Sequence, residues 1–139
     1  CTTLGQWRVL PQVCYDLRFP VWSRNRFTKD EQGILKAEYD VLLYVANWPA
    51  VRSYPWKQLL IAGAIENQCY VVGVNRIGSD GNGYAHSGDS VVVNPRGEII
   101  SKTEANVERV ETLILDRNYL EEYRRVFPVG WDADAFKLE

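Results

Sequence analysis

The stretch that decides the fold is Asp-Val-Leu-Leu-Tyr-Val-Ala at positions 40–46. Such a nearly continuous apolar run is typical of a strand that is buried on both faces of a sheet. A second run of this kind, Cys69 to Asn75, follows a helical pattern over Ser53 to Asn67. The predicted apolar side of that helix consists of Trp56, Leu59, Leu60, Ala64 and Ile65. Apolar strands that alternate with amphipathic helices predict an α/β fold.

The segments on either side extend this pattern. Towards the N-terminus we expect a strand over Trp7 to Val13 and a short helix over Leu17 to Arg26. Gly78 to Gly83 is rich in residues that tolerate positive φ and predicts a turn. The strands that follow should be Ser90 to Val93 and Glu98 to Ile100, a hairpin around residues 94–97, and then Val110 to Leu115.

The C-terminal part should contain one more helix. Asp116 is a good N-cap for a helix that runs to about Phe127. The tail from Pro128 to Glu139 has no clear period, and we expect it to pack through Trp131 and Phe136. Because several strands follow one another late in the chain, we predict a mixed sheet with helices on one face and another layer on the other.

Composition excludes several classes of protein. The chain has 139 residues, 46% of them hydrophobic, which is enough for one core but too few for two domains. With 16 basic and 18 acidic residues its net charge is −2, which argues against a nucleic-acid or membrane partner. The apolar runs are too short to span a bilayer. The sequence lacks methionine and begins at Cys1, so we expect a processed product, a partial chain or a chain without its front.

The cysteine and histidine content predicts a reducing compartment and no metal. The three cysteines at positions 1, 14 and 69 are widely spaced and odd in number, which favours a cytoplasmic protein over a disulfide scaffold. A zinc site would lack ligands, since His86 is the single histidine of the sequence. We predict no cofactor.

Cys14 is the first candidate for chemistry. It lies where the first predicted strand ends and a helical segment begins, so its sulfur should project outward beside helical N–H groups. Such groups lower a thiol pKa and can hold an oxyanion. The alternative is a buried structural cysteine, but the polar residues Tyr15, Asp16 and Arg18 that follow favour function. Cys69 lies in an apolar strand and should belong to the core, and Cys1 could act as an N-terminal nucleophile only if cleavage released it.

The other candidate catalytic or binding residues each allow a functional and a structural interpretation. His86 could serve as a base for Cys14 with Asp89 as its partner, although a structural loop histidine is the favoured reading. Asn47-Trp48-Pro49 follows a buried strand, at the end where α/β proteins usually bind ligands, so Trp48 is either a pocket wall or an exposed loop residue. The arginines that could bind a substrate carboxylate are Arg18, Arg24, Arg26 and Arg52, and the sequence does not choose among them.

Several ordered motifs resemble a known family. The residues that carry the resemblance are Val-Cys-Tyr-Asp-Leu-Arg-Phe-Pro-Val-Trp-Ser-Arg-Asn at 13–25, Tyr-Val-Ala-Asn-Trp-Pro at 44–49, Ala-Ile-Glu-Asn-Gln at 64–68, Val-Asn-Arg-Ile-Gly-Ser-Asp-Gly-Asn-Gly at 74–83 and Asn-Pro-Arg-Gly at 94–97. Together they resemble the nitrilase (carbon–nitrogen hydrolase) superfamily, and most closely its omega-amidase branch, which hydrolyses 2-oxoglutaramate-like amides. The resemblance covers essentially the whole chain.

The resemblance implies a fold and a reaction. The implied fold is an α-β-β-α sandwich, of which residues 1–139 would be the C-terminal part of a single domain, assembled as a homodimer or higher homo-oligomer. The implied reaction is attack of a thiolate on a small amide, release of ammonia and hydrolysis of a thioester. Cys14 would be the nucleophile, and the Tyr15 N–H would help to hold the oxyanion. Asn47 and Trp48 would lie near the substrate, and we place Arg18 with them.

Two departures from the family pattern bear on activity. The catalytic glutamate, the lysine and a supporting glutamate of the family precede the cysteine, whereas the thirteen residues before Cys14 contain neither Glu nor Lys. We therefore expect this chain alone to be inactive, with one face of its sheet uncovered and prone to aggregation. In addition, Gly63 stands where the family pattern has arginine.

Two rival hypotheses remain beside the amidase. One is a truncated, non-catalytic module that keeps the pocket and the dimer surface but only binds. The other is a thiol switch at Cys14. The sequence also leaves open whether the amide is 2-oxoglutaramate, 2-oxosuccinamate or another small amide, and how many subunits assemble.

Overall fold

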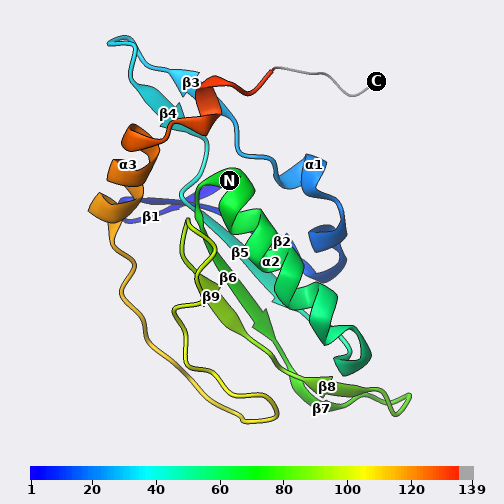
Figure 1. Ribbon diagram of the computed structural model, residues 1–139. Helices are drawn as coiled ribbons and strands as arrows, with labels where there is room; N and C mark the ends of the chain where they lie inside the picture. Colours follow the sequence, from blue (N-terminus) through cyan, green and yellow to red (C-terminus); the bar gives the residue numbers. More distant parts are fainter. Residues whose placement is uncertain (135–139) are drawn as a thin grey trace.

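The computed structural model describes residues 1–134 and contains a five-stranded mixed sheet in the order β1-β2-β5-β6-β9 (Figure 1). Its strands are β1 (Thr2–Leu4), β2 (Trp7–Val13), β5 (Val41–Ala46), β6 (Tyr70–Asn75) and β9 (Val91–Val93). The three central strands β2, β5 and β6 are parallel, and the two edge strands are antiparallel to their neighbours. The predicted α/β class and the predicted mixed sheet are both confirmed.

The remaining elements surround this sheet. Two small antiparallel ribbons pair β3 (Phe27–Lys29) with β4 (Leu35–Ala37) and β7 (Ile77–Ser79) with β8 (Ala85–Ser87). The α-helices are α1 (Pro20–Ser23), α2 (Ser53–Asn67) and α3 (Arg117–Val126), and the 3-10 helices are η1 (Cys14–Arg18), η2 (Ala50–Arg52) and η3 (Val129–Trp131). Within the described residues no helix is both long and apolar enough to cross a membrane.

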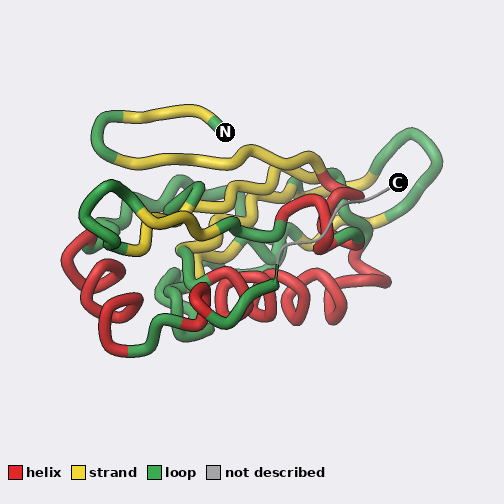
Figure 2. The backbone as a smooth tube through the Cα atoms, turned by 90° about the horizontal axis from the view of Figure 1, so that it is seen from above, coloured by secondary structure: helices red, strands yellow, loops and turns green. Residues whose placement is uncertain are grey.

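Helix α2 lies along one face of the sheet, as Figures 1 and 2 show together. Its bounds are those predicted, and its Trp56, Leu60 and Ala64 side chains are fully buried in the main core. They pack on Leu42, Tyr44 and Val71 of the sheet, with Leu59 at the edge. Ile65, which the pattern placed on the same side, is instead 49% exposed. The apolar stripe of α2 is therefore narrower than predicted.

The opposite face of the sheet is covered at one end only. Alternation along the strands directs Val41 and Tyr70 to this face, where they are buried with Leu120 of α3. At the other end Val13, Val45 and Val74 lie side by side in the register of the three parallel strands. Their exposed fractions are 67%, 55% and 46%. An apolar row in the middle of a sheet is thus open to solvent, as we expected of an uncovered face.

The helix predicted over residues 17–26 and the strand predicted over residues 110–115 are both wrong. Residues 17–26 do not form one helix, because η1 ends at Arg18 and α1 begins only at Pro20. The ring of Pro20 disfavours a helical conformation at Phe19, which has φ −124° and ψ 71°. Residues 110–115 form no strand, because no other described segment pairs with them, and a strand exists only through such pairing.

The helix predicted in the C-terminal part of the chain is present. The Asp116 carboxylate accepts a hydrogen bond from the Tyr119 N–H at 3.2 Å, so the predicted N-cap of α3 is confirmed. The turn at 94–97 is also present, closed by the Gly97 N–H on the Asn94 carbonyl at 2.9 Å. The predicted strand Glu98 to Ile100, however, is reduced to a single bridge between Ile99 and Val93. Lys29 lies over the Trp131 ring, whereas the expected packing of Phe136 falls outside the described residues.

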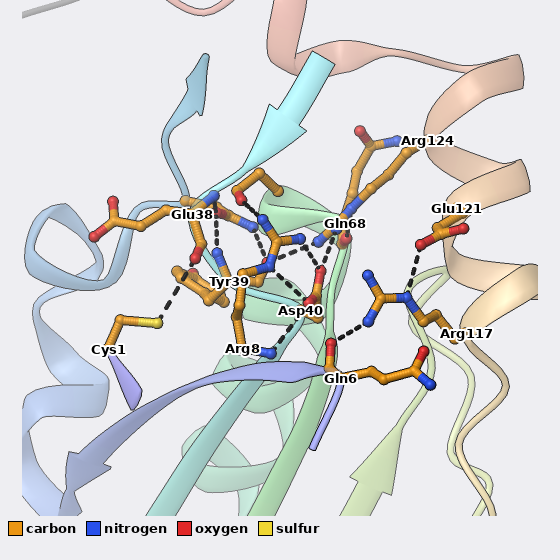
Figure 3. A network of polar contacts seen from close by, with 12 residues as sticks. Cys1, Gln6, Arg8, Glu38, Tyr39, Asp40, Gln68, Arg117, Glu121 and Arg124 are labelled. Atoms are coloured by element: carbon orange, nitrogen blue, oxygen red, sulfur yellow. Dashed lines mark hydrogen bonds and ion pairs between the residues drawn. The ribbon is translucent and has the colours of Figure 1, made fainter. Parts of the chain in front are cut away.

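An ion cluster around the buried Asp40 joins the N-terminal end of β5 to α3 (Figure 3). The Asp40 carboxylate accepts hydrogen bonds from Arg8 Nε at 2.9 Å and from Arg124 Nη1 at 2.8 Å. Arg124 also donates to the carbonyls of Tyr39 and Gln68. Burial opposes ionisation of Asp40, but hydrogen bonds from the two arginines hold its pKa below the usual range. The cluster fixes the start of β5 against the C-terminal helix.

Candidate active site

Cys14 lies at the sharp turn where β2 ends and η1 begins. Its φ is +43°, a left-handed conformation that non-glycine residues rarely adopt. The Asp16 carboxylate holds this turn by accepting a hydrogen bond from the Val13 N–H at 2.8 Å. The predicted strand-to-helix turn is confirmed, although the helix is a single 3-10 segment. Strained backbone of this kind is often found at functional residues.

A pocket of about 490 Å³ opens beside the half-buried Cys14. One side is formed by residues of η1 and its end, namely Cys14, Tyr15, Arg18 and Phe19. The other side is formed by the segment after β5, namely Asn47, Trp48, Pro49 and Arg52. Parallel pairing of β2 with β5 brings the carboxyl ends of both strands to this edge of the sheet. All five residues that we predicted for the site therefore line one pocket.

Trp48 is a buried, hydrogen-bonded wall of the pocket. It is 4% exposed, so the alternative of an ordinary exposed loop residue is wrong. The Trp48 indole donates from Nε1 to the Arg52 carbonyl at 2.7 Å. The backbone N–H of Trp48 donates to Asn75 Oδ1 at 2.8 Å, and Asn75 Nδ2 donates to the backbone carbonyl of Trp48 at 3.0 Å. Three hydrogen bonds thus hold the indole and the backbone of Trp48 in place beside the pocket.

Asn75 is a residue of the site region that sequence reasoning missed. It ends β6, the strand next to β5, and its amide also donates to the Gly88 carbonyl at 2.8 Å. The available signal was a polar side chain directly after an apolar strand, the same signal that drew attention to Asn47. Only the pairing of β5 with β6 reveals that Asn75 supports Trp48.

The fold separates the four candidate arginines. Arg18 and Arg52 line the pocket, and Arg24 and Arg26 do not. The Arg18 guanidinium lies 5.3 Å from the centre of the Trp48 ring, a cation–π distance. No Asp, Glu, Lys or His is found among the lining residues of the described pocket. The pocket therefore has two cations beside a thiol, and no side chain of its own that could accept the thiol proton.

The other two cysteines lie away from this pocket. Cys69 is fully buried in the main core, as predicted, and burial raises the pKa of its thiol to about 12. Cys1 is exposed, and its Sγ lies 3.6 Å from the Glu38 carbonyl oxygen, in the region of the Asp40 cluster (Figure 3). Neither sulfur lines the pocket.

His86 has the setting of a structural histidine, although it lies in a strand and not in the predicted loop. It is buried in β8, and its Nδ1 lies 2.9 Å from the Tyr84 carbonyl oxygen. Asp89, the proposed partner of His86, instead accepts hydrogen bonds from Ser53 at 2.7 Å and from Ser87, and pairs with Lys57 at 2.6 Å. Burial opposes ionisation of Asp89, but these contacts lower its pKa. His86 does not line the pocket of Cys14.

Comparison with known proteins identifies the family of this chain and several of its relatives. Residues 2–125 match the carbon–nitrogen hydrolase family. The chain is 54% identical over 132 residues to omega-amidase YafV of Escherichia coli K12, which covers 95% of this chain and 48% of that protein. It is 37% identical over 119 residues to 2-oxoglutaramate amidase of Bacillus subtilis 168, with 84% and 41% covered. The chain thus spans about half the length of the curated relatives it matches.

A solved structure has the same fold. The crystal structure of XC1258 from Xanthomonas campestris, a CN-hydrolase superfamily protein with an arsenic adduct in its active site, matches with a TM-score of 0.92. The sequence identity is 45%, and the match covers 100% of this chain and 51% of that one. The chain belongs to the nitrilase (carbon–nitrogen hydrolase) superfamily, in its omega-amidase-like branch.

Proposed function

We propose that this chain carries the nucleophile half of an enzyme that hydrolyses the amide carbon–nitrogen bond of small omega-amides such as 2-oxoglutaramate. The observation that carries the proposal is Cys14 at a strained turn that opens directly into the pocket. The relatives named omega-amidase and 2-oxoglutaramate amidase support the choice of substrate class.

The proposed reaction proceeds through a thioester. The Cys14 thiolate attacks the amide carbonyl carbon, and the oxygen that becomes negative accepts a hydrogen bond from the Tyr15 N–H. When the tetrahedral intermediate collapses, the carbon–nitrogen bond breaks, and the nitrogen leaves as ammonia after it gains a proton. Water then attacks the thioester, which releases a carboxylic acid and regenerates the thiol.

Residues on the wall of the pocket have proposed roles in binding. Asn47 offers an amide that can donate hydrogen bonds to the substrate and accept them from it, and Trp48 provides a flat aromatic surface beside it. Arg18, stacked over Trp48, adds a positive charge. A small polar substrate that lies on the indole would reach Cys14 from this side.

The proton acceptor must come from outside the pocket described above. Because no lining side chain is a base, we propose that the residues 1–139 alone are inactive. The Glu and Lys of the family pattern would then be supplied by additional chain, with residues 1–139 as the C-terminal part of one domain. We further propose that the active protein is a cytoplasmic homodimer or higher homo-oligomer.

The test measures ammonia release from 2-oxoglutaramate by the natural full-length protein, before and after Cys14→Ala. We expect the substitution to lower kcat by at least about 1,000-fold, because no second nucleophile lines the pocket. Mass spectrometry of the quenched reaction should find the acyl group on the peptide that contains Cys14. Full activity of the Cys14→Ala protein would refute the proposal. Ligand binding without turnover by the unmodified protein would favour the non-catalytic module instead.

A further inference from the structure

We propose that Asp89 is a positioning residue, which holds one wall of the Cys14 pocket in place from outside the pocket. This inference rests on the function proposed above and names a residue on which substrate binding depends. The wall segment is residues 47–52, four of which line the pocket across from η1. Asp89 does not line the pocket itself, so it can act on a ligand only through this segment.

The wall segment is tied to the rest of the chain by a side chain at each end. It connects β5 to α2 and belongs to no strand of the described sheets. Near its first end, the Asn75 side chain binds the backbone N–H and carbonyl of Trp48. Directly after its last residue, the Ser53 hydroxyl donates to Asp89 Oδ2 at 2.7 Å. Because no strand partner fixes the segment, its position depends on these two ties.

Both ties meet at the corner formed by residues 87–90, where β8 leads into β9. The Gly88 carbonyl accepts from Asn75 Nδ2 at 2.8 Å, and the Asp89 carbonyl accepts from Trp56 Nε1 at 2.8 Å. The φ angles of Gly88 and Asp89 are +74° and +55°, a conformation that Asp adopts more readily than most residues. The ribbon of β7 and β8 that leads into the corner lies beside the start of α2 (Figure 1).

The Asp89 carboxylate attaches this corner to the first turns of α2. It is buried, and its Oδ1 pairs with Lys57 Nζ at 2.6 Å, while its Oδ2 accepts from Ser53. Ser53 and Lys57 lie four residues apart, so one carboxylate contacts two successive turns of the helix. Hydrogen bonds to a charged acceptor are stronger than those between neutral groups. The carboxylate therefore fixes the start of α2, and with it the end of the wall segment, against the corner.

The first test measures hydrolysis of 2-oxoglutaramate by the natural full-length protein and by its Asp89→Asn variant. Asparagine keeps the size of the side chain and tolerates the positive φ, but it lacks the charge. We expect KM to rise about 10-fold and kcat to stay within about threefold, because the wall segment contributes to binding and does not carry the nucleophile.

Asp40→Asn is the matched control for this substitution. It also removes a buried carboxylate that pairs with cations, but at the N-terminal end of β5, away from the pocket. Its KM should stay within about twofold of the natural value even if its Tm falls as far as that of Asp89→Asn. A KM for Asp89→Asn that rises no more than the KM of this control would overturn the assignment.

A pair of serine variants tests the tie to the wall segment directly, and it decides the question if Asp89→Asn does not fold. Ser53 and Ser87 both donate to Asp89 Oδ2, and Ser53 follows the wall segment whereas Ser87 belongs to β8. We expect Ser53→Ala to raise KM about 3- to 10-fold and Ser87→Ala to change it less than about twofold, because only the first breaks the tie. Equal changes in KM would show that Asp89 does not act through the wall segment.

Hydrogen exchange separates failure of this inference from failure of the proposed function, because it needs no turnover. In Asp89→Asn the amides of residues 47–53 should exchange about 10-fold faster than in Asp40→Asn, since local opening becomes easier. This result supports Asp89 even if the natural protein does not hydrolyse 2-oxoglutaramate. Hydrolysis that depends on Cys14, combined with unchanged exchange and unchanged KM in Asp89→Asn, would leave the amidase standing and reject Asp89.

Discussion

At the scale of single residues, burial gives two cysteines of this chain opposite properties. Cys14 is half-buried, adopts a positive φ and borders the pocket, whereas Cys69 has no exposed surface and packs in the main core. Desolvation disfavours the charged form of a buried thiol and raises its pKa, in this case to about 12. Only the thiolate is a good nucleophile, so reactivity should follow exposure.

Alkylation with iodoacetamide at pH 8 should therefore modify Cys14 and leave Cys69 intact. The pH lies well below the pKa of about 12 for Cys69, so its thiolate is scarce as well as inaccessible. Peptide mass spectrometry would locate the adducts, and the exposed Cys1 is an internal positive control. Cys69 should react only after unfolding in urea. Modification of Cys69 in the folded protein would contradict this view of the core.

Asp40 should make the unfolding free energy of the protein depend on pH in the acidic range. Its pKa is lowered in the folded protein, so its contribution is complete above the unfolded carboxyl pKa of about 3.9 and is lost as the pH falls through the folded value. At pH 7, Asp40→Asn should cost about 3 kcal/mol of unfolding free energy, because it leaves the half-buried Arg8 and Arg124 without their carboxylate partner. The difference in unfolding free energy between the natural protein and Asp40→Asn should become smaller as the pH falls towards 3.

Urea unfolding of the full-length protein at both pH values measures these changes. Glu122→Gln is the matched control, because Glu122 pairs with Arg125 at an exposed position of α3. This substitution should have a far smaller effect at pH 7. Equal effects of the two substitutions would show that the Asp40 cluster does not stabilise the fold.

At the scale of elements, the close approach of α2 to β6 depends on a glycine in the strand. A Cβ on Gly73 would lie 2.5 Å from Leu60 Cδ1 and 3.0 Å from Trp56 Cζ2, both of which are fully buried. Gly63 in α2 is different, since a Cβ there would meet Leu42 Cδ2 at 3.9 Å, an ordinary contact. One glycine is required by packing and the other is not.

The substitutions Gly73→Ala and Gly63→Ala should therefore have opposite signs. Gly73→Ala should destabilise the protein by about 1–3 kcal/mol through overpacking. Gly63→Ala should stabilise it by about 0.5–1 kcal/mol, because alanine lowers the entropy lost in a helix interior. Thermal or urea unfolding of both variants is the measurement. A loss at Gly63 as large as that at Gly73 would indicate that α2 lies closer to the sheet than described.

At the scale of the whole molecule, the sheet has two unlike faces. Helix α2 covers one face, and the row of Val13, Val45 and Val74 leaves part of the other open. Contiguous exposed apolar surface on a sheet favours association with whatever can cover it. The chain spans about half the length of its curated relatives, so residues 1–139 expressed alone are a suitable test of this face.

We expect residues 1–139 expressed alone to self-associate, and Val45→Lys to reduce that association. The lysine would place a charge in the middle of the apolar row. Light scattering and size-exclusion chromatography measure the effect. Val110→Lys is the control, because Val110 is 93% exposed and lies outside every strand. An equal decrease in self-association with both lysine substitutions would show that net charge, and not this apolar row, controls association.

Local sequence signals determined much of this protein. The apolar runs around positions 40–46 and 69–75 and the helix between them appear where predicted, because continuous apolar runs and helical periodicity leave clear patterns. The expected burial on both faces holds for only part of each strand, since Val45 and Val74 are exposed. The turn at Cys14 and the Asp116 cap were also readable, since each depends on neighbouring residues. The strand expected at 110–115 is absent, because a strand depends on a partner that local sequence does not specify.

Only the tertiary structure decided which of these residues meet. Parallel pairing of β2, β5 and β6 brings Cys14, Asn47 and Asn75 to one edge of the sheet although up to 61 positions separate them in the chain. The same pairing singles out Arg18 and Arg52 from four similar arginines and leaves His86 outside the pocket. Proximity between distant residues is set by strand register and helix packing, and these follow from the burial of the whole core and not from any one segment.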